Sequence, residues 1–234
     1  MNRYVLHYAP DNASLIVRLA LELARLPYDT RLVDRAAAEQ TSAAYRRLNP
    51  HWMIPVLETP QGPIFETGAI LLWLADTHGG LAPAPDHPDR AAVLKWLFFV
   101  SNTLHPALRM TFYPDRYAGP DPAHQASLRD TMQAALKTHL GQLDALAASR
   151  PAWLDHETPG ILHCYLACCL RWCALYPRTT DRSWFRLADT PHLHNLCLNL
   201  ETLPCTLTAQ AAEGLGPTPF TAPRLANPPE GSAT

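Results

Sequence analysis

Glu66 and Thr67 are the residues of this sequence whose types and position most directly suggest binding chemistry. They stand where a short apolar strand pattern gives way to a helical one. The free backbone amides of a first helical turn and the Thr67 hydroxyl can hold a carboxylate there. The Glu66 carboxylate can pair with an ammonium group. The pair predicts a site for a ligand end that carries both charges, and Thr67 is at the same time a good helix cap.

A second group of polar side chains lies in and beside the loop from Pro10 to Leu15, which leads into a helical pattern. Asn12 offers an amide donor, Ser14 a hydroxyl donor, and Tyr8 a phenol on the preceding strand. Donors at a helix N-terminus stabilise an anion such as a thiolate. Ser14 can equally be the N-cap of that helix, so a catalytic role and a structural role both stay open.

Histidines and cysteines in the C-terminal third suggest a metal site at first sight: His163, Cys164, Cys168, His192, His194 and Cys197. No two cysteines have the CxxC spacing of a zinc site, and Cys164 and Cys168 share an apolar helix face. We therefore expect no metal, and reduced cysteines that pack as small apolar side chains.

Strand and helix patterns alternate over residues 1–80, which hold the first two groups. The predicted strands are Tyr4–Tyr8, 29–34, 54–58 and 63–65, and the predicted helices start at about Ser14 and cover Ala36–Arg47 and Thr67–His78. The order of a strand, a helix, a strand, a helix, two strands and a helix describes a compact α/β domain.

Only helical patterns follow the proline-spaced linker at residues 81–88, where a helix cannot continue. They cover about 89–113, 122–148, 159–175, 191–203 and 206–213. These patterns predict that residues 89–213 form an all-α domain. Residues 214–234 are rich in proline and lack a periodic apolar face. We expect them to form a tail that is extended over the surface or partly disordered.

Composition excludes several classes of protein. The chain has 234 residues, 47% of them hydrophobic, which suffices for a real core, and a net charge of −2, which attracts neither nucleic acid nor an anionic membrane. Its longest apolar run, Ala69–Ala75, is short of the about 18 residues that a membrane span needs. The N-terminus lacks a signal-peptide pattern. We expect a cytoplasmic protein with no nucleic-acid or membrane partner.

Several motifs resemble those of the cytosolic glutathione transferases. Residues 48–57 (LNPHWMIPVL) resemble the stretch that in this family holds a cis-proline before the third strand, and residues 66–70 (ETGAI) resemble its Glu-Ser-x-Ala-Ile signature. Residues 8–21 are similar to its first strand, active loop and first helix, and residues 101–105 (SNTLH) to a stretch of the bacterial beta class. The resemblance, over about residues 3–213, implies a thioredoxin-like domain followed by a helical bundle, with glutathione as co-substrate.

This resemblance implies where glutathione binds. Glu66 and Thr67 would hold its γ-glutamyl end, and a cis Ile54–Pro55 bond would leave the Ile54 backbone to pair with its cysteinyl part. Met53 replaces the family's usual lysine, so His51 or Arg109 would serve the glycyl carboxylate. The expected glutathione-binding residues are His51, Met53, Ile54, Pro55, Glu66, Thr67 and His105.

The same resemblance ranks the candidates for thiol activation. Ser14 falls where plant-type enzymes carry a catalytic serine, so we place it first, followed by Asn12 and then Tyr8. The beta-class catalytic cysteine falls on Ala13, so the usual nucleophile for redox chemistry is missing. Asp11 can only accept hydrogen bonds and would repel a thiolate. The family's helix-capping box is also lost at Gly160–His163, and Thr158–Pro159 would start that helix instead.

We therefore expect a detoxifying glutathione transferase that activates the thiol for attack on a small apolar electrophile. The expected acceptor site is Phe98, Arg109, Met110, Tyr113 and Tyr117. Two alternatives stay open, a glutathione-dependent disulfide reductase or peroxidase and a non-catalytic binding module of the same fold. Family resemblance also implies a homodimer, for which Trp73 and the aromatic run 96–99 offer apolar surface.

Overall fold

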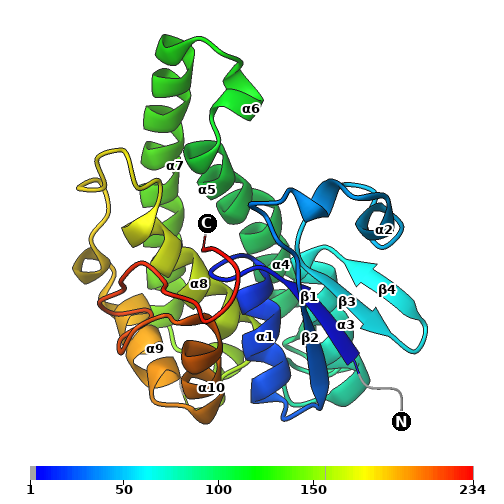
Figure 1. Cartoon of the computed structure of the whole chain (residues 1–234). Coiled ribbons are helices and arrows are strands. Elements are labelled where there is room, and N and C mark those ends of the chain that lie inside the picture. Colours follow the sequence, from blue (N-terminus) through cyan, green and yellow to red (C-terminus); the bar gives the residue numbers. More distant parts are fainter. Residues whose placement is uncertain (1–3, 156, 234) are drawn as a thin grey trace.

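Four strands form a single sheet in the computed structural model, which describes residues 4–155 and 157–233 (Figure 1). Their order across the sheet is β2 (Tyr28–Leu32), β1 (Tyr4–Tyr8), β3 (Val56–Thr59) and β4 (Gly62–Phe65). β1 and β2 are parallel, as the helical crossover between them requires, whereas β3 is antiparallel to β1 and β4. This is the predicted thioredoxin-like arrangement.

Helix α1 (Ser14–Leu23) joins the two parts of the molecule. It contacts α3 (Thr67–His78) within the N-terminal part and α8 (Ile161–Leu175) and α10 (Pro204–Glu213) of the helical part. Every residue from Ser14 to Leu21 is buried. The buried stretch includes two polar residues, Ser14 and Arg18, which donate hydrogen bonds to the Ala9 carbonyl and to Glu213.

The predicted helix over Ala36–Arg47 is wrong. The segment holds one 3₁₀ turn, η1 (Glu39–Thr41), and the short helix α2 (Ala43–Arg46). Ala38 has a φ of 54°, and Ser42 is extended and accepts a hydrogen bond from the Tyr45 amide. The chain therefore restarts at Ser42, because a helix cannot pass through a left-handed residue.

The remaining helices form the predicted all-α part: α4 (Arg90–Phe99), α5 (His105–Phe112), α6 (Asp115–Ala118), α7 (Pro122–Ala148), α8, α9 (Pro191–Glu201) and α10. Two 3₁₀ turns, η3 (Ala152–Leu154) and η4 (Leu187–Asp189), lie in the connections. The sequence predicted a single helix over 89–113. The structure instead inserts a π-helical turn, η2 (Val100–Leu104), between α4 and α5.

Helix α8 begins at Ile161 rather than at the expected Thr158–Pro159 start. The Gly160 amide donates to Nδ1 of His163 at 3.0 Å, so a histidine does what the acid of a capping box would do. The Ile161 amide donates to the Leu81 carbonyl, and a Cβ on Gly160 would lie 2.3 Å from that oxygen. Only glycine permits this approach of the linker to the helix.

All six cysteines are free and buried, four of them in α8. Burial raises the pKa of each thiol, so these cysteines behave as core residues and not as nucleophiles.

Within the described residues, no three His, Cys, Asp or Glu side chains gather as a metal site would require. The helices of the described chain also include none long and apolar enough to cross a bilayer.

The C-terminal segment, residues 214–233, is extended as predicted but is not a loose surface tail. Leu215 and Phe220 are buried, and the Phe220 and Thr221 amides donate to Oε1 of Glu201 at 2.6 and 2.7 Å. The segment then returns past α8 and α1 to the end of β1 (Figure 1, red). The prolines of this segment prevent a helix but leave its backbone carbonyls free to accept hydrogen bonds from other parts of the chain. An extended segment that packs in this way has no periodic apolar face, so the sequence pattern does not reveal its contacts.

Candidate active site

A cavity of about 440 Å³ lies between the thioredoxin-like part and helices α5, α6 and α8. The N-terminal wall includes Asn12, Met53, Ile54, Pro55, Glu66 and Thr67, and the opposite wall includes Ser101, His105, Arg109, Tyr113, Arg116 and Tyr117. The lining also includes Tyr165 and Trp172 of α8 and Tyr176, which directly follows that helix. Its volume falls within the range of sites for small molecules.

Three residues of the N-terminal wall have a strained backbone. Asp11, Trp52 and Glu66 all have positive φ, at 50°, 60° and 69°, and all three line the cavity. Such residues cost about 1–3 kcal/mol each and cluster at binding sites. The peptide bond between Ile54 and Pro55 is cis, as the family resemblance implied.

The start of α3 points at the cavity. Glu66 and Thr67 are the last residue before α3 and its first, and Gly68 follows on the same wall. Among the described side chains, none makes a hydrogen bond or ion pair with the Glu66 carboxylate. The first-turn amides and this carboxylate can therefore bind a carboxylate and an ammonium group side by side, as the sequence predicted.

The π-helical turn η2 brings α5 onto this site. A Cβ on Gly68 would lie 3.2 Å from the Cβ of Ser101, so the small residue lets α3 and η2 meet closely. Beyond the turn, His105 lines the cavity. Extra turns of this type often mark functional sites, because they re-aim the side chains that follow.

Asn12 is the thiol-activation candidate that reaches the cavity. Its side-chain oxygen is buried without a hydrogen-bond partner, and none of the described residues accepts a hydrogen bond from its side-chain N–H₂ group, so this donor remains available to a ligand. Its place just before α1 adds the favourable electrostatics of a helix N-terminus.

Ser14 and Tyr8 do not line the cavity, which corrects the order in which the sequence ranked them. The Ser14 hydroxyl is fully buried, donates to the Ala9 carbonyl at 3.0 Å and accepts from the Ala9 amide at 3.2 Å. The Tyr8 hydroxyl donates to Glu230 of the C-terminal segment, and burial, followed by this contact, raises the pKa of Tyr8. Both hydroxyls are therefore occupied by structural contacts.

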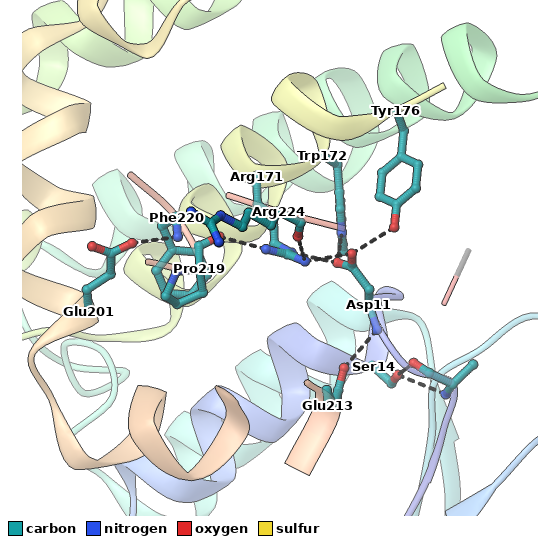
Figure 2. Close-up of polar contacts among 11 residues, drawn as sticks. Asp11, Ser14, Arg171, Trp172, Tyr176, Glu201, Glu213, Pro219, Phe220 and Arg224 are labelled. Atoms are coloured by element: carbon teal, nitrogen blue, oxygen red, sulfur yellow. Dashed lines mark hydrogen bonds and ion pairs between the residues drawn. The ribbon is translucent and has the colours of Figure 1, made fainter. Parts of the chain in front are cut away.

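Asp11 turns its carboxylate toward α8, where three side chains bind it through four hydrogen bonds (Figure 2). Arg171 donates from Nε to Oδ1 at 2.8 Å and from Nη2 to Oδ2 at 2.9 Å. The Trp172 indole N–H and the Tyr176 hydroxyl donate at 3.0 and 2.7 Å. The sequence predicted that Asp11 would repel a thiolate. The structure corrects this, because a bidentate guanidinium balances its charge.

The same network ties the loop that contains Asp11 and Asn12 to the C-terminal segment. Arg171 also donates to the carbonyls of Pro219 and Arg224, each at 2.9 Å. Glu213 accepts from the Asp11 amide at 2.8 Å (Figure 2). It also accepts from Nε of Arg18 at 2.7 Å. Burial raises the pKa of Glu213 while the Arg18 charge opposes that shift. Asn12 is thus held by a buried network that begins one residue before it.

His105 is a neutral imidazole at pH 7. Burial, with the nearby charge of Arg109, lowers the pKa of His105 to about 4. Its Nδ1 is 2.9 Å from the Tyr165 hydroxyl, and its ring stacks at a 5.4 Å centroid distance on Trp172. A neutral ring can position a ligand by hydrogen bonding but supplies no charge.

Three other predicted site residues lie outside the cavity. His51 is exposed and packs its ring against Phe65 at 5.7 Å, and Phe98 is 53% exposed on α4. Met110 does not line the cavity, whereas Arg109 of α5 and Tyr113, which directly follows α5, do. Of the two candidates for a glycyl carboxylate, His51 and Arg109, only Arg109 reaches the site.

The sequence also missed several residues of the lining: Arg35, Gln40, Trp52, Arg116, Tyr165, Trp172 and Tyr176. A signal existed for three of them. Tyr165, Trp172 and Tyr176 are spaced seven and four residues apart within or just after an otherwise apolar helix, which places their polar atoms on one face. Arg35 and Arg116 follow turns whose course the sequence does not define.

Comparison with known proteins agrees with this geometry. Residues 13–77 match the family model described as "Glutathione S-transferase, N-terminal domain". "Glutathione S-transferase GST-4.5" of Xanthomonas campestris is 32% identical over 169 residues, which cover 71% of this chain and 81% of that protein. The chain therefore belongs to the glutathione S-transferase family.

Two further similarities show how broad the family is. "Maleylacetoacetate isomerase" of Rhizobium meliloti is 29% identical over 161 residues, covering 68% of this chain and 72% of the isomerase. A sphingomonad glutathione S-transferase solved in complex with glutathione is 27% identical, with a TM-score of 0.73, over 91% of this chain and 100% of that one. Disulfide-bond oxidoreductases are among the other relatives.

Proposed function

We propose that this protein is a cytoplasmic glutathione transferase that activates the glutathione thiol with Asn12 and delivers it to a small electrophile. The observation that carries the proposal is that one cavity joins Asn12, at the N-terminus of α1, to Ile54, Glu66 and Thr67. A detoxifying role follows if the electrophile is a toxic compound.

The charges of the lining fit a glutathione molecule. Its α-carboxylate would bind the first amides of α3 and the Thr67 hydroxyl, and its ammonium group would pair with Glu66. Arg109, whose Nη1 is 2.9 Å from the Met53 sulfur, would hold the glycyl carboxylate. A thioether sulfur is a weak acceptor, so Arg109 has strong donors to offer a ligand. His105 and Met53 would complete the binding site.

The chemistry assigned to the protein is thiol activation and proximity. Asn12 would donate to the sulfur, and the α1 terminus would favour its negative charge, so the thiol proton passes to solvent near neutral pH. The thiolate then forms a bond to the electrophilic carbon, and the leaving group departs with its electron pair. Phe112, Tyr113 and Tyr117 would hold the electrophile beside the sulfur.

Replacing Asn12 by alanine is expected to raise the pKa of bound glutathione by about 1–2 units, because a hydrogen bond to a charged group is worth about 1.5–3 kcal/mol. The measurement is a titration of thiolate absorbance in the presence of saturating glutathione. Ser14→Ala is the matched control and should leave the titration in place, since its hydroxyl is bound to Ala9. A shift in Ser14→Ala without one in Asn12→Ala would reverse the assignment.

The two other functions would be separated by their substrates. A disulfide reductase would have to use a second glutathione, because every cysteine of the chain is buried with a raised thiol pKa. Faster turnover of a mixed disulfide than of an aryl halide would favour that reaction. A binding module would bind glutathione without lowering its thiol pKa.

We also propose a homodimer. The rings of Trp73 and Trp96 pack within the chain, on Tyr4 at 5.8 Å and on Phe99 at 5.3 Å. Phe98, in contrast, is 53% exposed on α4 and supplies apolar surface for a two-fold contact. Sedimentation equilibrium should give twice the 26.0 kDa mass of the chain. The Phe98→Glu substitution should lower the measured mass toward that of a single chain. A monomer at micromolar concentration would contradict the dimer.

A further inference from the structure

The lining of the cavity includes three guanidinium groups, those of Arg35, Arg109 and Arg116. Arg109 and Arg116 come from α5 and α6, and Arg35 comes from the segment after β2. Among the described residues, the acidic side chains of the lining are those of Asp11 and Glu66. Asp11 is already balanced by Arg171, and Glu66 lies at the start of α3.

Two of these arginines converge on Tyr113. Nη2 of Arg35 donates to the Tyr113 hydroxyl at 3.2 Å, and the Arg116 guanidinium lies over its ring, 5.0 Å from the centroid. The chain makes this corner because α5 ends at Phe112 and Pro114 precedes the short helix α6. The turn folds Arg116 and Tyr117 back onto the cavity.

Arg109 and Arg116 form no ion pair with any described carboxylate, and Nε of Arg109 is buried without a partner among the same residues. One glutathione molecule would use Arg109 for its glycyl carboxylate, as proposed above. The corner formed by Arg116 and Tyr113, with Arg35 on the far side of the phenol, is then left for the second substrate. A guanidinium fork is the side chain best suited to a carboxylate.

We propose that Arg116 and Tyr113 bind a carboxylate of the second substrate, so that the acceptor is an anionic and not a purely apolar electrophile. The inference rests on the proposed transferase function and names the class of its acceptor. The aromatic side chains Phe112 and Tyr117 favour a flat, unsaturated or aromatic carboxylate. The same corner would also accept a carboxylate of a second glutathione.

A matched pair of acceptors tests the inference: 4-chloro-3-nitrobenzoate, which is anionic, and 4-chloro-3-nitrobenzamide, which is neutral. In both, the thiolate sulfur bonds to the ring carbon that carries chlorine, and chloride leaves with the bonding electrons. Each kcat/KM is divided by the uncatalysed rate constant with glutathione, which removes the intrinsic reactivity. The benzoate should be favoured by about tenfold or more, and Arg116→Gln should abolish most of this preference.

Arg31→Gln is the control, because it removes the same charge from an exposed strand residue outside the cavity and should leave the preference as it is. Calorimetry with glutathione disulfide identifies the other source of the carboxylate. If the corner serves a second glutathione, Arg116→Gln weakens disulfide binding by about tenfold and the benzoate is not preferred. That result would mean that the corner binds a carboxylate, but that the carboxylate belongs to a second glutathione and not to the electrophile.

Equal relative rates for benzoate and amide, together with unchanged disulfide affinity in Arg116→Gln, would overturn the inference while the transferase function stands. Turnover of neither acceptor, with no acidification of bound glutathione, would remove the proposed function and this inference with it. An equal loss of the benzoate preference in Arg31→Gln and in Arg116→Gln would also overturn the inference. The preference would then arise from the electrostatic field of the whole protein and not from a local contact with Arg116.

Discussion

Arg171→Met is expected to lower the free energy of unfolding by about 3–5 kcal/mol, the range for removing one partner of a buried ion pair. The Asp11 and Arg171 side chains are both fully buried, and two hydrogen bonds of 2.8 and 2.9 Å join them. The variant would leave the Asp11 carboxylate with the Trp172 and Tyr176 donors, which carry no charge. It would also free the Pro219 and Arg224 carbonyls.

Urea unfolding at pH 7 measures this effect. Arg186→Met is the matched control, since Arg186 and Asp189 form an exposed pair whose loss should cost less than about 1 kcal/mol. Adding Asp11→Asn to Arg171→Met should restore part of the lost stability, because the unpaired buried charge is then gone. An Arg171→Met protein within about 1 kcal/mol of the wild type would show that the pair is not the anchor of the active loop.

Glu66→Gln and Thr67→Ala are each expected to weaken glutathione binding by about 1.5–3 kcal/mol, or roughly 10-fold to 150-fold in Kd. Glu66→Gln removes the charge that pairs with the ammonium group. Thr67→Ala removes a hydroxyl at the α3 terminus that would bind the carboxylate. Because both residues line the cavity, the losses should appear in calorimetry as reduced affinity with unchanged stoichiometry.

Matched substitutions away from the cavity complete that experiment. Glu157→Gln and Thr138→Ala change the same residue types at exposed positions and should leave the affinity for glutathione within a factor of two. Unchanged affinity in both Glu66→Gln and Thr67→Ala would place the γ-glutamyl end of glutathione elsewhere.

Local signals let the sequence predict much of the scaffold. α3 and α7 have their predicted bounds, and Pro122 is the first residue of α7, where proline is favoured. Thr67 is the first residue of α3 and not its N-cap, which is Glu66 and makes no side-chain cap hydrogen bond, so the cap predicted at Thr67 is wrong. β1 also has its predicted bounds, and the α/β order follows from alternating periodicities. Glu66 and Thr67 were predictable for the same reason, since a strand end and a helix start fix their place.

Contacts between distant parts of the chain could not be predicted in this way. Asp11 meets Arg171 at a separation of 160 residues, and Tyr8 meets Glu230 at a separation of 222. The choice between Ser14 and Asn12 depends on a loop that turns the Ser14 hydroxyl back onto Ala9. Arg116 reaches the cavity only because Pro114 interrupts the helical path. None of these has a periodic signature.

The most direct test of the central claim, that this cavity binds glutathione by its γ-glutamyl end, compares glutathione with cysteinylglycine by calorimetry on the wild-type protein. The dipeptide keeps the thiol and the glycyl carboxylate but lacks the group assigned to Glu66 and Thr67. Glutathione should bind with one site per chain, and cysteinylglycine at least about tenfold more weakly. Equal affinity for the two, or no binding of glutathione, would contradict the account.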